Sequence, residues 1–134
     1  MNTHVNFNGQ CEEAFKFYEK VLNGKVTFLM TYEGTPAADQ VPPEWRKKVI
    51  HATLTVNGAR LQGADAPPGR YQKPQGFSVA LNVKGAAEAE RVFKALSDKA
   101  NISMPMQETF WAQRFGMLTD RFGIPWMVNC GKPM

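Results

Sequence analysis

The chain has 134 residues, of which 43% are hydrophobic and 21% are charged. This is the length of one ordinary domain and the composition of a globular protein, which excludes a disordered chain. The formal net charge of +4 is only mildly basic. Its densest basic run is RKK at residues 46–48. Because no basic stripe interleaved with aromatic residues is present, nucleic-acid binding is not expected.

The two cysteines, Cys11 and Cys130, form neither a C-x-x-C motif nor a zinc-finger spacing. The opening stretch MNTHVNFNG is polar and lacks the apolar segment of a signal peptide. No apolar run reaches the length of a membrane span. We therefore expect a cytoplasmic protein in a reducing environment, without membrane association.

The first half of the chain predicts a strand, a helix and three further strands. Apolar and polar residues alternate over residues 4–8, and helical spacing follows from Glu12 to Val21. KVTFLMTY at residues 25–32 has the β-branched and aromatic content of a strand. VIHATLTVNGARLQGAD is typical of two strands joined by an Asn-Gly hairpin. Between them, EGTPAADQVPPEWRKK is rich in Pro and Gly and is interpreted as an insertion.

The second half repeats this order, which indicates an internal duplication. VALNVKGAAEAERVFKALSDKANISM overlays the first segment without gaps when Val5 is placed on Leu81 and Phe17 on Phe93. The closing strands in RFGMLTDRFGIPWMVNC match the earlier hairpin, with Met127 at the position of Gln62. Each half is therefore predicted to be a βαβββ module. We expect one domain over residues 1–134, with module 1 at about 2–66, a linker at about 67–75 and module 2 at about 76–131.

The expected fold class is α+β, with two βαβββ modules forming a half-open, barrel-like sheet around one cleft. Period-two alternation assigns side chains to the helix-free faces that would line this cleft. They are His4, Asn6, Asn8, His51, Thr53, Thr55, Arg60, Gln62 and Ala64 from the first module, and Ser78, Ala80, Asn82, Met127 and Asn129 from the second. The predicted cleft is polar and mostly neutral, and it holds both histidines of the chain.

NFNGQCEEAFKFYEKV, HATLTVNGARLQGAD and above all RFGMLTDRFGIPWMVNC resemble the vicinal oxygen chelate superfamily. That superfamily includes glyoxalase I, bleomycin-resistance proteins and extradiol dioxygenases. Within it, the chain is most similar to the PhnB-like group, often labelled 3-demethylubiquinone-9 3-methyltransferase. The resemblance covers nearly the whole chain and implies the glyoxalase/bleomycin-resistance fold. The methyltransferase label has no support from the residues, because no G-x-G loop occurs and the order of elements does not suit a doubly wound sheet.

Metal-dependent members of the superfamily use four cleft positions, usually occupied by His, Gln or Glu. Carried over by position, these fall on Asn2 or His4, Gln62, Gly76 or Ser78, and Met127. Because the thioether of Met127 does not replace a carboxylate for a hard or borderline divalent ion, the resemblance implies a cleft without the superfamily's metal, and no cofactor is expected. If a divalent metal bound nevertheless, its ligands would be His4, His51 and Gln62.

Three functions stay open. In the first, the protein binds a small organic molecule, with Trp111 as a stacking wall and Arg114 as an anion clamp, or as a partner of Asp120 or Glu108. The expected ligand-binding residues are His4, Asn6, Thr53, Gln62, Trp111, Arg114, Met127 and Asn129. In the second, it is a lyase, isomerase or dioxygenase-like enzyme acting on a small oxygenated substrate, with His51 as the catalytic acid–base residue. In the third, its main role is assembly with a partner. The resemblance also implies a homodimer.

Overall fold

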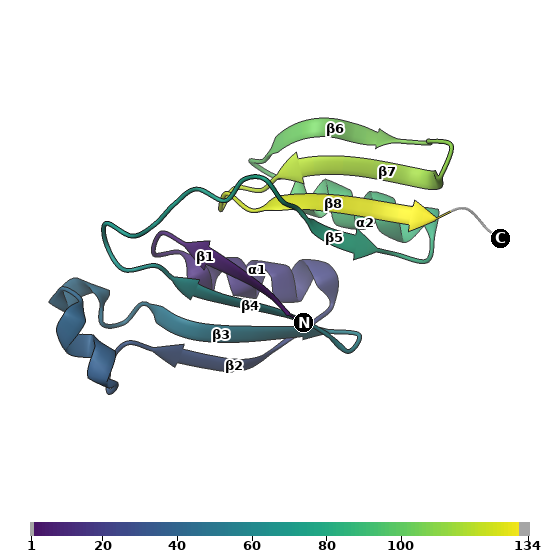
Figure 1. Cartoon of the computed structure of the whole chain (residues 1–134). Coiled ribbons are helices and arrows are strands. Elements are labelled where there is room, and N and C mark those ends of the chain that lie inside the picture. Colours follow the sequence, from purple (N-terminus) through teal and green to yellow (C-terminus); the bar gives the residue numbers. More distant parts are fainter. Residues whose placement is uncertain (1, 132–134) are drawn as a thin grey trace. The chain divides into compact units, whose positions relative to one another are not determined.

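The computed structural model describes residues 2–131, and the chain divides into two compact units, Met1–Lys73 and Pro74–Met134 (Figure 1). Unit 1 contains β1 (Thr3–Phe7), α1 (Cys11–Leu22), β2 (Lys25–Thr31), two short 3-10 helices (Pro36–Gln40 and Pro43–Trp45), β3 (Val49–Val56) and β4 (Ala59–Asp65). Unit 2 contains β5 (Val79–Asn82), α2 (Ala86–Leu96), β6 (Asn101–Gln107), β7 (Ala112–Thr119) and β8 (Pro125–Gly131). The predicted βαβββ order is confirmed in both units. No helix within residues 2–131 is long and apolar enough to cross a membrane.

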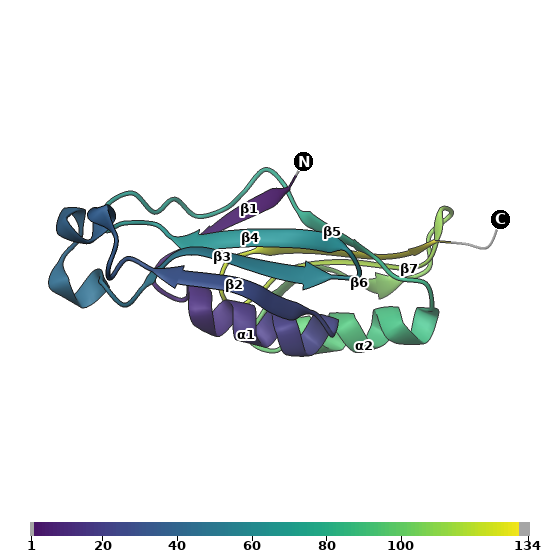
Figure 2. The same cartoon turned by 90° about the horizontal axis from the view of Figure 1, so that it is seen from below.

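Each unit folds its strands into one four-stranded sheet, and the two sheets have equivalent topologies. The strand order is β1-β4-β3-β2 in unit 1 and β5-β8-β7-β6 in unit 2. The first and last strands of each module pair in parallel, whereas the other neighbours are antiparallel. Within each unit the helix covers one face of the unit's own sheet (Figure 2). This shared topology confirms the internal repeat and the α+β fold class.

The core of unit 1 forms where the apolar stripe of α1 meets alternate residues of the sheet. Val5 and Phe7 of β1 are buried, while their neighbours His4 and Asn6 are exposed. The ring of Phe7 meets that of Phe15 from α1 edge-on, with centroids 6.0 Å apart. The predicted period-two alternation is therefore correct for β1, and it places the polar residues on the face that the helix does not cover.

The gapless overlay of the two halves places helix residues of unequal burial on one another. Phe93 is buried on α2, whereas Phe17 is only half-buried on α1. Phe93 lies against Gly116 of β7, whereas Phe15 lies against Gly63 of β4, which is not the equivalent strand. Each helix turns its own apolar stripe to its sheet, so the two helices do not bury identical positions.

Gly63 illustrates how closely α1 approaches its sheet. A Cβ atom at this position would lie 2.8 Å from two ring atoms of Phe15 and 3.2 Å from the carbonyl oxygen of Val5. The ring of Phe15 is fully buried and has no free space to move into. We expect Gly63→Ala to lower the free energy of unfolding by about 1–3 kcal/mol, as overpacked cores do, in urea denaturation.

Gly85→Ala is the matched control, because a Cβ atom at Gly85 would meet nothing within 4 Å and the backbone there is extended. It is expected to cost less than Gly63→Ala, because it loses only the preference of a helix N-cap for Gly over Ala, about 1 kcal/mol or less. Equal urea midpoints for the two variants would show that the contact with Phe15 is not tight.

Candidate functional site

One row of side chains crosses the helix-free face of the unit 1 sheet. His4 of β1 is paired with Gln62 of β4, Gln62 with Thr53 of β3, and Thr53 with Phe28 of β2. Residues that are directly opposite on neighbouring strands share a face. Leu61 and Gly63, which flank Gln62, are buried on the helix side, so the row itself lies on the other side.

The two histidines of the chain meet on this face although they come from different strands. The rings of His4 and His51 are stacked, with centroids 6.4 Å apart and planes 19° from parallel. His4 Nε2 lies 3.2 Å from the side-chain oxygen of Asn6, and His51 Nε2 lies 3.5 Å from Thr53 Oγ1. The structure thus brings five of the predicted site residues together. We call His4, Asn6, His51, Thr53 and Gln62 the histidine face.

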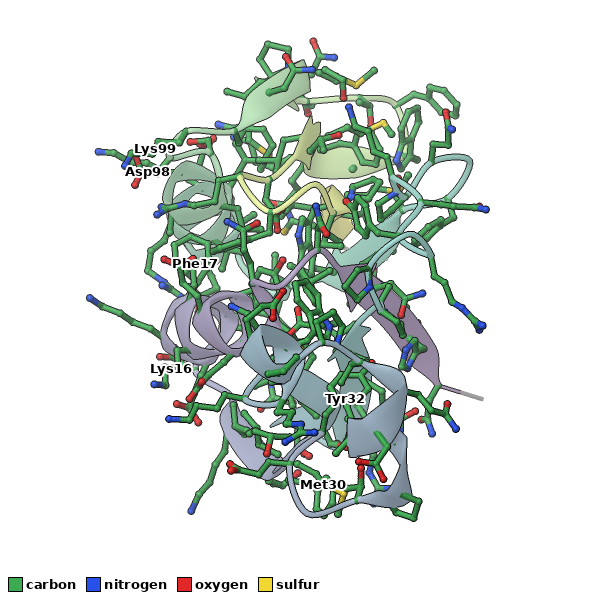
Figure 3. All side chains as sticks on the ribbon, turned by 90° about the vertical axis from the view of Figure 1, so that its left-hand side faces the viewer. Lys16, Phe17, Met30, Tyr32, Asp98 and Lys99 are labelled. Carbon is green, nitrogen blue, oxygen red and sulfur yellow. The ribbon has the colours of Figure 1, made fainter. Side chains whose placement is uncertain are left out.

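Apolar side chains border the histidine face on β2. The ring of Phe28 lies 5.7 Å from that of His51, and Phe28 keeps 45% of its surface exposed. Met30 is paired with His51 and is 43% exposed. Tyr32, which follows Met30 just beyond the end of β2 (Figure 3), is buried instead, and its hydroxyl donates to the carbonyl oxygen of Asp65 at 2.7 Å. An exposed aromatic and aliphatic border therefore lies beside neutral polar groups.

The equivalent row of unit 2 has a different chemistry. Met104 of β6 is paired with Met117 of β7, Met117 with Met127 of β8, and Met127 with Ala80 of β5. We call Met104, Met117 and Met127 the methionine row. Trp126 and Val128 on either side of Met127 are buried, so the row lies on the helix-free face.

The remaining predicted residues of unit 2 separate into two groups. Asn129 donates to the side-chain oxygen of Asn82 at 3.2 Å and is paired across the strands with Phe115. The ring of Trp111 packs edge-on against that of Phe115, with centroids 5.3 Å apart. Trp111 and Asn129 therefore both adjoin Phe115, close to the methionine row.

Arg114 does not belong with these residues. It is paired with Cys130 on the helix side of the sheet, and its Nε donates to Glu90 of α2 at 2.8 Å. The suggested ion pair with Asp120 or Glu108 is wrong; the partner is Glu90. Strict alternation from Phe115 places Arg114 on the helix side. The period-two pattern of the sequence therefore already indicated its face of the sheet.

Two carboxylates, Asp65 and Asp120, are buried, which the sequence analysis did not predict. Asp65 accepts the backbone N–H groups of Cys11 and Val49, each at 2.9 Å. Asp120 accepts those of Phe122 and Ile124 at 2.9 Å and the indole N–H of Trp126 at 2.8 Å. Both are fixed by structural hydrogen bonds, and the only hint in the sequence is an acidic residue at the end of a strand.

Cys11 begins α1 and is fully buried. Burial raises the pKa of its thiol far above the usual range, and the nearby charges of Asp65 and Glu12 raise it further. Because the thiolate is the reactive form of cysteine, Cys11 is a core residue and not a nucleophile.

The residues do not fit a divalent metal of the kind used in the superfamily. Gln62 and His4 oppose each other in unit 1, but the matching pair in unit 2 is Met127 and Ala80. Ala80, and not Gly76 or Ser78, is thus the residue opposite Met127, and it has no donor atom. Over residues 2–131, no three His, Cys, Asp or Glu side chains gather into a possible metal site. A thioether with neutral partners is a poor site for a hard or borderline ion.

Residues 1–129 match the protein family described as 3-demethylubiquinone-9 3-methyltransferase. The chain belongs to this family. It is 40% identical to protein PA1353 from Pseudomonas aeruginosa, over 99% of each chain and with a TM-score of 0.87. It is 25% identical to the PhnB protein from Bacillus cereus, over 98% of each chain and with a TM-score of 0.82. Protein YjdN of Escherichia coli (strain K12) is 29% identical, over 98% of this chain and 95% of YjdN.

Likeness of fold extends beyond the family. A glyoxalase/bleomycin resistance protein/dioxygenase domain from Frankia sp. EAN1pec has a TM-score of 0.66 at 12% identity, over 98% of this chain and 95% of that one. The predicted PhnB-like group is confirmed by the family match, and the predicted glyoxalase/bleomycin-resistance fold by this likeness. The family's description does not show methyltransferase activity for this chain, because one fold hosts many functions and the sequence contains no G-x-G loop.

Proposed function

We propose that the protein binds a small organic molecule on the helix-free faces of its modules, without the superfamily's divalent metal. The observation that carries the proposal is the histidine face. There the two imidazoles, two amides and a hydroxyl group lie beside the exposed Phe28 and Met30. Ligand sites typically combine an apolar wall with a few polar groups that fix orientation.

The chemistry of this face supports a neutral, oxygenated ligand. Gln62, Asn6 and Thr53 offer both donors and acceptors, and a neutral imidazole offers one of each. Trp111, Met127 and Asn129 are proposed to contribute from the second module, whereas Arg114 is not, because Glu90 holds its guanidinium group. A cytoplasmic homodimer remains part of this proposal.

The test is a screen of small oxygenated aromatic compounds, read by backbone-amide NMR. Bound compounds are expected to shift the amide signals of β1, β3 and β4, and His51→Ala and Gln62→Ala should each weaken binding by about tenfold, the equivalent of one lost hydrogen bond. Lys16→Ala, an exposed change on α1 (Figure 3), is the control and should leave binding unchanged. Binding that persists in both face variants would refute the proposal.

A second candidate is an enzyme in which His51 transfers a proton to or from a small oxygenated substrate. The stacked pair of His51 and His4 favours it, because imidazole is the side chain best suited to proton transfer near neutral pH. If a bound compound is converted, His51→Gln should abolish conversion while binding persists. Equal conversion by wild type and His51→Gln would show that His51 does not transfer the proton.

A further inference from the structure

The helix-free face of the unit 2 sheet carries three methionines that ligand binding at the histidine face does not explain. Met104, Met117 and Met127 occupy adjacent strands at directly paired positions. Their counterparts in unit 1 are Phe28, Thr53 and Gln62, which have no sulfur. The module duplication therefore does not account for the methionines, and their clustering is particular to unit 2.

The register brings the three thioethers within reach of one another. Side chains that are directly opposite on neighbouring strands have Cβ atoms about 4.5–5.5 Å apart. Methionine is unbranched and has three rotatable side-chain bonds, so Met104 and Met127 can both lean toward the central Met117. All three are half-buried, which leaves them accessible from solvent while shielding them in part from water.

Three thioethers constitute a donor set for a soft cation. Thioether sulfur is neutral and polarizable, and soft ligands of this kind select Cu(I), whereas Mg²⁺, Ca²⁺ and Mn²⁺ prefer oxygen. Ala80, which completes the row, is small and leaves room beside Met127. We propose that Met104, Met117 and Met127 bind a soft monovalent cation, Cu(I) or its redox-inert analogue Ag(I), at one site per chain. The same thioethers that make the face unsuitable for a hard divalent ion suit a soft one.

The test is a titration of the full chain, labelled with ¹³C at the methionine methyl groups, with silver nitrate. The methyl signals of Met104, Met117 and Met127 are expected to shift together and to saturate at one Ag(I) per chain. Those of Met106, on the helix side of β6 against Phe93 and Gly116, and of Met30 in unit 1 should not move. No shift, or shifts shared equally with Met106 and Met30, would overturn the proposal.

Substitutions separate the site from other silver-binding groups, of which the thiols of Cys11 and Cys130 are the foremost. Both thiols are fully buried, so silver captured by them would leave the three methyl signals in place and refute the proposal.

Met117→Leu conserves volume and should cost less than about 1.5 kcal/mol of stability, yet it removes the central donor. It should weaken Ag(I) binding at least about tenfold, since even indirect partners of a metal contribute about 10- to 100-fold. Met106→Leu is the matched control and should leave affinity unchanged; an unchanged affinity in Met117→Leu as well would overturn the site.

Discussion

Replacing Asp120 with alanine is expected to lower the free energy of unfolding by about 3–5 kcal/mol, because three buried donors lose their acceptor. The carboxylate accepts the backbone N–H groups of Phe122 and Ile124 on Oδ1 and the indole N–H of Trp126 on Oδ2. Asp120 is only 5% exposed, so water does not readily replace these bonds. Urea denaturation followed by tryptophan fluorescence measures the loss.

The control for Asp120 is an acidic residue of the same unit that is exposed. Asp98 follows the C-terminal end of α2 (Figure 3) and pairs with Arg121 at 2.6 Å, with 64% of its side chain exposed. Exposed ion pairs contribute about 0–1 kcal/mol, so Asp98→Asn should have a small effect. If Asp120→Ala were no more destabilising than Asp98→Asn, the hydrogen bonds around Asp120 would not support the turn between β7 and β8.

Much of the fold was predictable because its determinants are local and periodic. The alternation of Val5 and Phe7 with polar neighbours, the apolar stripe of α1 and the Asn-Gly hairpin each specify one element from adjacent residues. The duplication then predicted the second module from the first. Met127 and Asn129 were placed on the helix-free face by the same alternation, since Trp126 and Val128 beside them are buried.

Features that depend on register between distant strands were less accessible from the sequence. His4 and His51 could be assigned to one face, but their stacking depends on how β1, β4 and β3 align. The methionine row required the pairing of Met104 with Met117, which lies between two register shifts in β6. Arg114 was expected where the sheet opens to the cleft, whereas alternation along β7 points to the helix side, where Arg114 pairs with Glu90.

Asp65→Asn is expected to reduce stability by about 2–4 kcal/mol, because a buried amide cannot accept both of the bonds that the carboxylate accepts. Asp65 receives the N–H of Cys11 on one oxygen and that of Val49 on the other. An asparagine side chain has one oxygen and directs its NH₂ group at the remaining donor. The carboxylate also lies at the N-terminus of α1, where negative charge is favourable. Asp39→Asn, at a 91% exposed site beside Arg46, is the control and should change stability by less than about 1 kcal/mol.

Hydrogen exchange can distinguish this cause from a general loosening of unit 1. The variant should accelerate exchange most at the amides of Cys11 and Val49, the two donors that Asp65 holds. Val49 begins β3, two residues before His51, so Asp65 fixes the start of the strand that carries half of the histidine pair. We therefore expect the stacked contact between His4 and His51 to weaken together with the Val49 amide. Unchanged exchange at Val49 would mean that β3 is held by its neighbouring strands alone and that Asp65 does not position the histidine face.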